Sequence, residues 1–520
     1  MHLSCINSQH ISYPFGIKSA KRVGRLCVSL ALTLALGPVD AWADQQSINQ
    51  TTLSFREFLN AVLESNRPLL AAQTEGEIAR EVVAERLEIF EPTLTVRSSV
   101  GRTLSPLSVE DQLLGRSPDP YPDNQSTLEG EISKLLGSGT RLSVHSSLKR
   151  QKTGDLDDYQ YRGSAGVSLV HPLIRGAGTD ITRIDVSIAE LDAKIREHSV
   201  IDQKNSIASQ AAMVYTEAVK NQLIIDKLRD RVEVLTRLKD EVSILITNGR
   251  LPVSSAIDIE INLNKLDNLI SITERDLLRF KTELLNLAPK QNLVPDKMRF
   301  DVSILPTHNF PMPSRQQLYN TALYTRHDIK IQKLEIKRAI LKLEQASDMA
   351  RDTLNVRLDA GLSQQTETAS GALSLNDMIS HPEGKIAIEY KTRLGTKGGA
   401  NARIKQAELE KRNGELLLQD RLQILKNEVL VSHNAVIQTE KVWAKTRAIT
   451  ESSNEQHYIE SSRLAQGRGN IIEVLQSQEK KIEAAMSEIE ASTQYMKAMI
   501  QLYSIQGDLS DQIYNMLTKK

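Results

Sequence analysis

The sequence predicts a mainly helical protein that carries two strand-rich segments and consists of two internal repeats. Three observations lead to this fold class. Long stretches keep apolar residues three and four positions apart, and two other segments alternate apolar and polar residues. The first short helix and the start of the strand after it recur 260 residues later, and the same order of elements follows. The composition agrees, because charged residues make up 25% of the chain and aromatic residues only 4%, a balance typical of coiled coils.

Residues 1–43 have the layout of a secretory signal peptide. Basic residues that include Arg22 and Arg25 precede an apolar core from Leu26 to Leu36, and Ala41-Trp42-Ala43 follows as a cleavage site. The region before the apolar core is long for a signal peptide, so the natural start of the chain is left open.

Both cysteines, Cys5 and Cys27, lie in this leader, so the mature chain is expected to contain no thiol, no disulfide and no cysteine metal site. No later stretch approaches the roughly 18 apolar residues of a membrane-spanning helix. The formal net charge is zero, which argues against a nucleic-acid partner. If this protein enters a membrane, we expect it to do so through strands.

Residues 44–287 form the first predicted repeat, which begins with a short helix from Leu53 to Glu91. Ser54 and Glu57 have the spacing of a capping box, and Pro92 ends the helix. Strands are expected over about 93–174. They comprise an alternating segment from 93, a loop over 105–126, short strands at 128–136 and 141–148 around Gly137, a loop over 149–158 and a strand at 161–171.

A very long helix follows from about Thr182 to Leu287, broken once at 248–252, where Asn248, Gly249, Arg250, Leu251 and Pro252 stand in sequence. A glycine followed by a proline is typical of a helix end, so we expect a helical hairpin with its tip here. Both arms keep one apolar seam, as in a supercoiled helix pair. The seam residues are Ile225, Leu228, Val232, Leu235, Val242 and Ile246 before the tip, and Ile259, Leu263, Leu266 and Ile270 after it.

Residues 288–313 contain five prolines and are expected to be an irregular linker. Residues 314–520 form the second predicted repeat. Phe58, Asn60, Leu63, Thr93, Leu94 and Val96 are matched, 260 positions later, by Leu318, Asn320, Leu323, Thr353, Leu354 and Val356. This repeat has strands at about 353–394 with a loop over 363–383, a long helix from about Asn401, a tip at 466–469 and a return helix.

With these features in place, the sequence resembles the TolC-like outer-membrane factor (outer membrane efflux protein) family. The resemblance rests on the ordered two-copy pattern, on Val170-His171-Pro172-Leu173-Ile174-Arg175-Gly176 before the long helix, and on the two glycine-containing tips. The second tip, with Ile471-Ile472-Glu473-Val474-Leu475, is similar to the family's signature.

The resemblance implies a homotrimer in the cell outer membrane of a Gram-negative envelope. Its strands would close into one β-barrel in contact with outer-membrane lipid, and its helices would continue as a coiled-coil α-barrel in the periplasm. Such proteins are exit ducts of tripartite efflux pumps or type I secretion systems. Their partners are a periplasmic adaptor protein and an inner-membrane pump or ABC exporter, and no cofactor is implied.

The family pattern has four strands per protomer. The additional hairpin around Gly137 leaves two alternatives open, since it either adds two strands to the barrel or folds over its rim. The transported substrate is also left open by the sequence.

The resemblance also implies a pore constriction at the helix tips. Glu473 takes the place of an acidic ring position, and the next such position is Gln476. The aromatic residue that helps to hold the closed state falls on Leu464, its contact positions fall on Ser254 and Ser255, and Arg468 or Arg250 is available for a different latch. The alternative is that Glu473 is only a solvated coiled-coil residue.

The tips are expected to contact the adaptor, with Asn248, Gly249 and Arg250 in the first and Gln466, Gly467 and Arg468 in the second. The alternative for the arginines is that each only complements a helix dipole and solvates the turn.

An enzyme is not expected. The histidines show no metal-ligand spacing, Gly395 to Gly399 lacks the P-loop pattern, and no Gly-x-Ser-x-Gly motif is present. The alternative is a non-transport coiled-coil protein of the envelope, structural or adhesin-like. It would explain the long helices but not the strands that lie at matching places in the two repeats.

Overall fold

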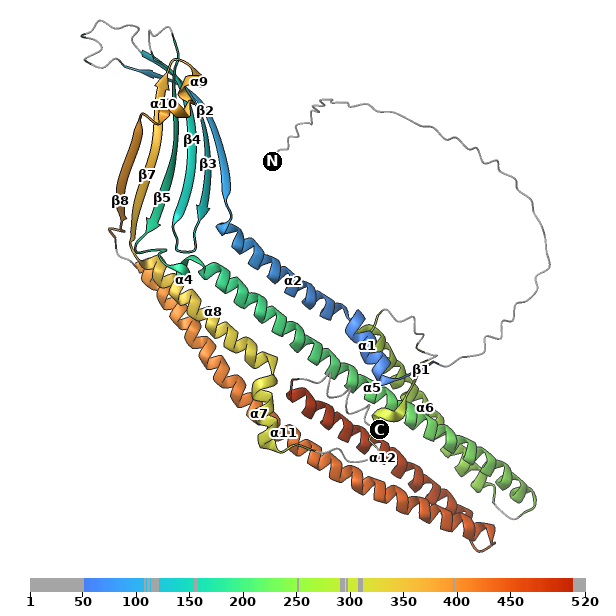
Figure 1. Ribbon diagram of the computed structural model, residues 1–520. Helices are drawn as coiled ribbons and strands as arrows, with labels where there is room; N and C mark the ends of the chain where they lie inside the picture. The colour runs from blue at the N-terminus through green and yellow to red at the C-terminus, as the bar shows by residue number, and fades with distance from the viewer. Residues whose placement is uncertain are drawn as a thin grey trace, which may run out of the picture. The chain divides into compact units, whose positions relative to one another are not determined.

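The computed structural model describes residues 51–106, 109, 113, 121–153, 158–249, 252–289, 295, 298–306, 312–395 and 398–507 (Figure 1). The chain divides into two units, Met1–Asn49 and Gln50–Lys520, and the described residues all belong to the second. The expected signal peptide therefore lies outside the described residues, as do Arg250 and Leu251 at the first tip.

The N-terminal helix expected from Leu53 to Glu91 is two α-helices and a short turn: α1 (Phe55–Ser65), α2 (Arg67–Leu87) and the 3₁₀ turn η1 (Glu88–Phe90). Ser54 and Glu57 form the predicted capping box. The expectation of one continuous helix is wrong at Asn66, whose backbone is extended and whose side chain accepts a hydrogen bond from the Leu69 amide at 3.1 Å. Pro68 follows in the first turn of α2, where the N–H that it lacks needs no partner.

The same arrangement returns 260 residues later in α7 (Arg315–Thr325) and α8 (His327–Ala350). Arg326 stands at the break, as Asn66 does in the first half, and Ser314 forms a capping box with Gln317. The helix boundaries of the two halves therefore follow the spacing that the sequence predicts.

Four long helices form two hairpins. The first is α5 (Ile184–Thr247), preceded by the short α4 (Thr179–Thr182), with α6 (Ser254–Leu287); the second is α11 (Gly398–Ala465) with α12 (Ile471–Ile505). The predicted seams are confirmed. Leu228, Leu235, Val242, Ile259 and Leu266 are buried together in the first hairpin, and Leu425, Val429, Val436 and Trp443 in the second. Helix α12 also packs against α5, which joins the hairpins side by side.

The strands form one six-stranded antiparallel sheet in the order β2-β3-β4-β5-β7-β8. Their bounds are Thr93–Ser105, Tyr121–Leu135, Arg141–Thr153, Gln160–Pro172, Thr353–Thr366 and Pro382–Lys391. The expected loops over 105–126, 149–158 and 363–383 are therefore wrong at their ends, where β3, β4 and β7 extend into them. Cross-strand pairing with a neighbour overrides the local turn preference of residues such as Pro122 and Asp123, which pair with Leu104 and Thr103.

The hairpin around Gly137, which the sequence left open, lies inside this sheet. Every residue of β2 pairs with a residue of β3, and β4 pairs with both β3 and β5. The hairpin therefore adds two strands, and the chain contributes six strands rather than the four of the family pattern.

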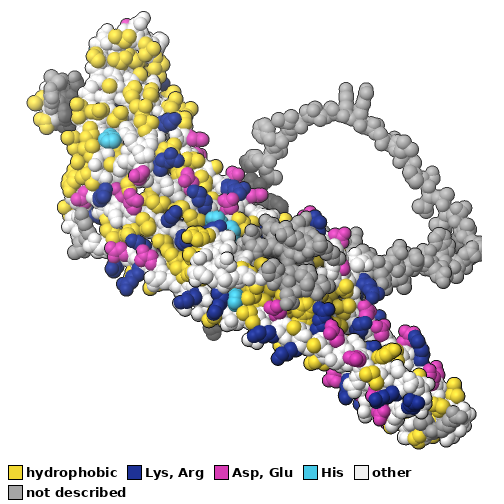
Figure 2. Space-filling view, turned by 60° about the horizontal axis from the view of Figure 1, so that its bottom comes forward, with side chains coloured by type: hydrophobic (Ala, Val, Ile, Leu, Met, Phe, Trp, Pro, Cys, Tyr) yellow, Lys and Arg dark blue, Asp and Glu magenta, His cyan; other side chains and the backbone are white. Residues whose placement is uncertain are grey.

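One face of the sheet is apolar and the other polar. The register aligns Leu94, Ile132, Val144, Val167, Ala360 and Gly384 in one row across all six strands, and the next row is Thr95, Glu131, His145, Gly166, Gly361 and Glu383. Leu94, Ile132, Val144 and Val167 are 43–66% exposed. The surface over the strands is accordingly rich in hydrophobic side chains, whereas charged residues are scattered along the helices (Figure 2). A soluble sheet would bury such a face.

Between β7 and β8 the loop holds two single-turn helices, α9 (Ala369–Ala372) and α10 (Leu375–Met378). Ala372 and Met378 are buried against β5 at Gly163, where a Cβ atom would lie 1.9 Å from the Ala372 carbonyl oxygen. Within the described residues, no helix combines the length and hydropathy that a membrane span needs.

The expected irregular linker over 288–313 contains a strand, β6 (Met298–Phe300), and a 3₁₀ turn, η3 (Val302–Ile304). Strand β6 pairs in parallel with β1 (Thr51–Leu53), a pairing that the prolines of the linker concealed. The side-chain amide of Gln222 in α5 bonds both backbone groups of Phe300 in β6, accepting from its N–H at 2.8 Å and donating to its carbonyl at 3.1 Å.

Tyr215 of α5 is the centre of this core. Its ring is fully buried and contacts Phe55, Phe58 and Phe300, with ring centroids 5.3–6.0 Å apart. Its hydroxyl donates to the Leu53 carbonyl at 2.7 Å and accepts from the Asp301 amide at 3.1 Å. Burial raises the Tyr215 pKa well above its usual value, so the hydroxyl keeps its proton.

We predict that Tyr215→Phe lowers the free energy of unfolding by about 0.5–1.5 kcal/mol, because the Leu53 carbonyl and the Asp301 amide, which also bond to each other, each lose one hydrogen-bond partner. The measurement is the thermal unfolding of the purified protein, with Tyr458→Phe as the control, since Tyr458 is 73% exposed. Equal effects of the two substitutions would contradict the assignment of Tyr215 as the centre of this core.

Candidate functional site at the helical hairpin tips

The second tip joins α11 to α12 through Gln466, Gly467, Arg468 and Gly469. The Arg468 N–H donates to the Arg463 carbonyl at 2.9 Å, and the Gly467 N–H donates to the Leu464 carbonyl at 2.9 Å. This pair of bonds is the Schellman arrangement, and it requires the positive φ of +72° that Gly467 has.

Gly469 has a different reason to be glycine. A Cβ atom there would lie 2.7 Å from the Leu464 backbone nitrogen, so the return of the chain is too close for a side chain. Asn470 then caps α12 through its side-chain oxygen, which accepts from the Ile472 amide at 3.0 Å. Gly469 and Asn470 were not among the predicted site residues, although an Asn directly before an apolar helical run is an N-cap signal.

The first tip uses the same ending. Asn248 is the C-cap of α5, and Gly249 has a φ of +66° and donates its N–H to the Ile246 carbonyl at 2.9 Å. After the two undescribed residues, Pro252 and Val253 lead into α6. Arg250, predicted to contact a partner, thus lies outside the described residues.

The predicted constriction residues belong to the ends of three helices. Ser254 and Ser255 begin α6, Leu464 lies in the last turn of α11, and Glu473 is in the first turn of α12. Glu473, Gln476, Arg468, Gln466, Asn248, Gly249 and Ser254 are exposed, and Leu464 and Ser255 are half-buried. An exposed carboxylate in the first turn also complements the helix dipole, so Glu473 has a structural role within one chain.

Apolar packing holds the two tips together within one chain. Ile471 and Leu475 of α12 pack against the buried cluster of the first hairpin that contains Val242 and Ile259. Further from the tips, the Arg231 guanidinium of α5 lies 4.0 Å from the Glu479 carboxylate of α12. Burial is the main cause of the lowered Arg231 pKa, and Glu479 opposes it.

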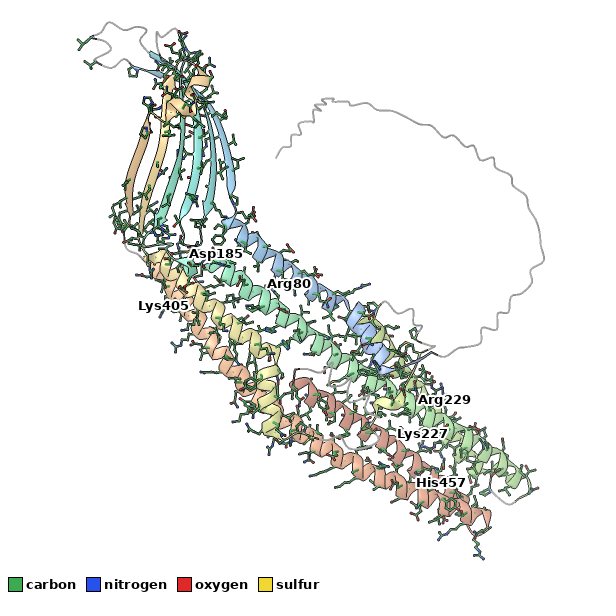
Figure 3. All side chains as sticks on the ribbon, in the orientation of Figure 1. Arg80, Asp185, Lys227, Arg229, Lys405 and His457 are labelled. Atoms are coloured by element: carbon green, nitrogen blue, oxygen red, sulfur yellow. The ribbon has the colours of Figure 1, made fainter. Side chains whose placement is uncertain are left out.

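His457 lies between α11 and α12 close to the second tip (Figure 3). Its Nδ1 is 3.1 Å from the Ser477 hydroxyl, which donates its own proton to the Val474 carbonyl at 2.9 Å. The Ser477 oxygen must therefore accept from Nδ1–H, and Nε2 is left to accept from the Ser461 hydroxyl at 3.4 Å. Burial lowers the pKa of His457, as does the nearby Lys481 charge, so the ring is neutral.

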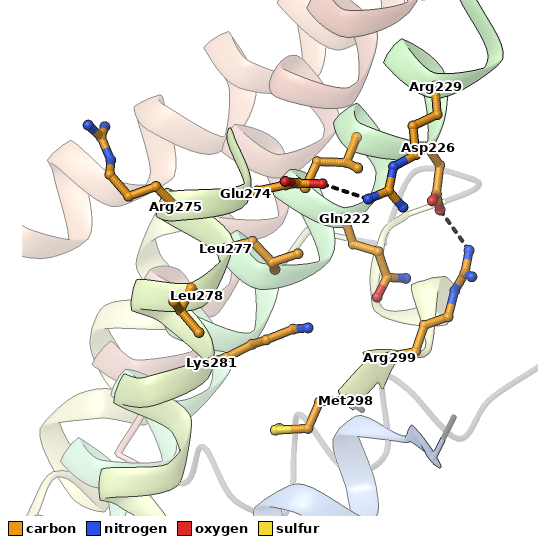
Figure 4. Close-up of a pocket in the computed structure, with 11 residues that line it drawn as sticks. Gln222, Asp226, Arg229, Glu274, Arg275, Leu277, Leu278, Lys281, Met298 and Arg299 are labelled. Atoms are coloured by element: carbon orange, nitrogen blue, oxygen red, sulfur yellow. Dashed lines mark hydrogen bonds and ion pairs between the residues drawn. The ribbon is translucent and has the colours of Figure 1, made fainter. Parts of the chain in front are cut away.

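A cleft of about 440 Å³ lies between α5, α6 and β6 (Figure 4). Four of its charged residues form two pairs, Arg229 with Glu274 at 2.6 Å and Arg299 with Asp226 at 2.9 Å. The second pair ties strand β6 to α5. Across the described part of the chain, no cluster of three or more His, Cys, Asp or Glu side chains is placed to hold a metal ion.

Comparison with known proteins identifies the class of this fold. No protein-family model and no curated protein sequence matches the chain. Solved structures do: the outer-membrane channel OprN has a TM-score of 0.62 at 13% identity, covering 87% of this chain and 89% of its own. VceC, an outer membrane protein of Vibrio cholerae, has 0.60 at 14%, covering 87% and 96%. The open state of the Neisseria gonorrhoeae MtrE outer membrane channel has 0.60 at 14%, covering 87% and 88%.

The chain therefore has the fold of outer-membrane channel proteins of this class. This confirms, for the fold, the resemblance to the TolC-like outer-membrane factors. At these identities the comparison carries the fold and none of the residue roles at the tips.

We predict that acid loosens the second tip through His457. An unfolded His titrates near 6.5, whereas the folded-state pKa is lower, so the unfolded form binds more protons below pH 6.5. The stability that neutral His457 contributes is thus complete above about pH 6.5 and is lost as the pH falls below it. Hydrogen exchange of the Ile472–Ser477 amides, corrected for the intrinsic pH effect, is expected to accelerate between pH 7.5 and 5.5.

His457→Gln is expected to remove most of this pH effect, because an amide bonds to both serines without titrating. The exposed His381 serves as the control position. An unchanged pH dependence in His457→Gln would rule out this side chain as the origin.

Proposed function

We propose that this protein is a member of the TolC-like outer-membrane factor family and acts as the exit duct of a tripartite efflux pump or type I secretion system. Three copies would close their strands into one β-barrel in the outer membrane of a Gram-negative envelope. The helices would continue as a periplasmic coiled-coil barrel that receives substrates from an inner-membrane pump or ABC exporter through a periplasmic adaptor. Residues 1–43 would be removed as a signal peptide.

The observation that carries this proposal is the two-faced sheet. Each of its strands has at least ten residues, and a strand needs about 9–11 to cross a bilayer. The apolar rows are exposed in the single chain and suit contact with lipid, whereas the opposite polar rows suit a water-filled lumen. The class of channel that shares the fold supports the same reading.

Oligomerisation follows from the sheet edges. Within one chain β2 and β8 each have a neighbour on one side only, and an unpaired strand edge is costly in a lipid environment where water cannot satisfy it. Pairing β2 of one copy with β8 of the next would satisfy both edges and generate a ring.

The two-repeat organisation, 44–287 and 314–520 around the linker at 288–313, is part of the proposal. The matched breaks at Asn66 and Arg326 and the matched capping boxes support it. An adhesin-like or purely structural coiled coil would need the long helices but not an apolar sheet face. This alternative is therefore the second candidate function.

The proposal is tested by fractionation and by gel migration. A barrel-forming trimer is expected to be found in the outer-membrane fraction. It is also expected to migrate differently on a denaturing gel before and after heating. Recovery of the chain as a soluble periplasmic protein would reject the duct and favour the structural alternative.

The tips are proposed as the entrance of the duct. In a trimer, three copies of Glu473 would ring the opening, with Gln476 one turn further on and with Leu464, Ser254, Ser255 and Arg468 around them. Negative charges that line a pore attract cations and repel anions. The exposure of Glu473 in the single chain is compatible with this role.

We predict that Glu473→Gln shifts the cation-to-anion permeability ratio toward one, because three negative charges leave the constriction. The reversal potential of the purified trimer in a planar bilayer under a salt gradient measures it. Glu473→Asp keeps the charge and is expected to keep the selectivity. An unaltered reversal potential in Glu473→Gln would contradict the ring and leave Glu473 only the role of complementing the dipole of α12.

The tip residues Asn248, Gly249, Arg250, Gln466, Gly467 and Arg468 are proposed to contact the adaptor. We predict that alanine at both Arg250 and Arg468 weakens adaptor cross-linking and export, since two cations per chain leave the rim. Arg463→Ala is the matched control, because Arg463 lies in the same hairpin but pairs with Glu460 at 3.2 Å. Normal export by a stable double variant would exclude the arginines as contacts.

A further inference from the structure

The β3–β4 hairpin is an integral part of the sheet. Its two strands lie between β2 and β5, and they pair with each other without interruption from Leu135–Arg141 at one end to Asp123–Thr153 at the other. A hairpin folded over a barrel rim would leave β2 and β5 as direct neighbours. Here they are separated by two full strands (Figure 1).

The turn of this hairpin is fastened to the end of the sheet where the long helices begin. Thr140 Oγ1 lies 2.8 Å from Nδ1 of His171, and the Gly178 N–H donates to the Ser138 carbonyl at 3.3 Å. Gly139 has a φ of +86°, and a Cβ atom on it would lie 2.4 Å from the Gly176 carbonyl oxygen. The hairpin is therefore held in place by the connection between β5 and α4.

The same connection is tied to the second half of the chain. The Gly176 N–H donates to the buried Asp348 carboxylate at 3.0 Å, and the Leu173 N–H donates to the Leu354 carbonyl at 2.7 Å. Both halves and the additional hairpin thus meet at one level, at which β2, β4 and β7 begin and β3, β5 and β8 end.

The hairpin also has the two faces of its neighbours. Leu128, Ile132 and Val144 are exposed on the apolar face. Glu129, Glu131 and His145 lie on the polar face, where Glu129 pairs with Arg97 of β2 at 3.5 Å. Because β3 and β4 share this alternation, their length and their level in the sheet with β2 and β5, all four strands would cross the outer membrane together.

We infer that the duct opens to the outside through an eighteen-stranded barrel, six strands from each of three copies. This inference rests on the proposed trimer and deepens it. Six is an even number, so β2 and β8 run in opposite directions and the junction between copies continues the antiparallel order. Eighteen is also an even number, as antiparallel closure requires.

The number of strands sets the width of the exit. Barrel diameter grows roughly linearly with strand number, so eighteen strands give a barrel about one and a half times as wide as twelve. Barrels of this size hold an aqueous channel. The additional hairpin brings Glu129 and Glu131 to the lumen, which suits hydrated, bulky polar solutes. The size limit of the duct then lies at the helical tips and not at the exit.

Cysteine pairs on the full-length protein test the strand assignment. Ile132→Cys and Val144→Cys are expected to resist a membrane-impermeant maleimide in intact outer membranes, whereas Glu131→Cys and His145→Cys are expected to react from the lumen. Leu94→Cys and Thr95→Cys in β2 give the matched reference pair, with Cys5 and Cys27 replaced by serine. Equal reactivity on both faces of β3 and β4, with the β2 pair still distinguished, would overturn the inference.

The strand count itself is read from a cryo-EM map of the trimer in lipid nanodiscs, where eighteen strands are expected. A trimer with twelve strands would overturn the inference while leaving the proposed duct intact. A chain that forms no membrane trimer would instead overturn the proposed function.

Excision of residues 121–153 gives a second readout, because β2 and β5 run antiparallel and become neighbours when β3 and β4 are removed together. The barrel of the excised trimer is expected to have twelve strands and about two thirds of the parent diameter, which makes its cross-section roughly twofold smaller. Cryo-EM maps of the two trimers in lipid nanodiscs measure both widths. An excised trimer whose barrel is as wide as that of the parent would contradict an exit widened by this hairpin.

Discussion

The long helices depend on each other, because none of them has a hydrophobic core of its own. Helices of 64 and 68 residues pack against their return helices through a narrow stripe in which buried residues recur every seven positions, as at Leu228, Leu235 and Val242. A strict seven-residue repeat imposes a left-handed supercoil on the pair. At each tip the first helix of the hairpin ends through a glycine with positive φ, Gly249 or Gly467.

Local signals predicted the helical part of the fold well. Side-chain spacing, capping boxes and tip glycines act within a few residues, so one sequence contains them in full. The breaks at Asn66 and Arg326 escaped prediction because apolar residues continue on both sides of each break and only the cap geometry separates the two helices. The Pro68 that follows Asn66 is a signal for that break, since proline prefers the first turn.

The strands were predicted less completely, because a strand is defined by its partner. Tyr121 to Asp123 have the composition of a loop and become strand only because Thr103 to Ser105 lie opposite. The pairing of β1 with β6 joins residues almost 250 positions apart and left no mark in the local pattern. At the candidate site, the turn geometry was predictable, but in the proposed trimer the surroundings of Glu473 would come from other copies of the chain, which one sequence does not place.

The two ends of the molecule are built under different constraints, and this bears on where selectivity resides. At the tips, Gly469 admits no side chain and Ile471 is packed against the first hairpin, so a change there disturbs the helix ends themselves. In the sheet, two antiparallel strands are inserted together without changing the direction of any neighbour, so the width of this part can vary at little cost to the rest. In the proposed duct, the packing therefore fixes the geometry of the entrance, whereas the width of the exit depends on the number of strands. The six-stranded contribution of this chain is one outcome of that freedom.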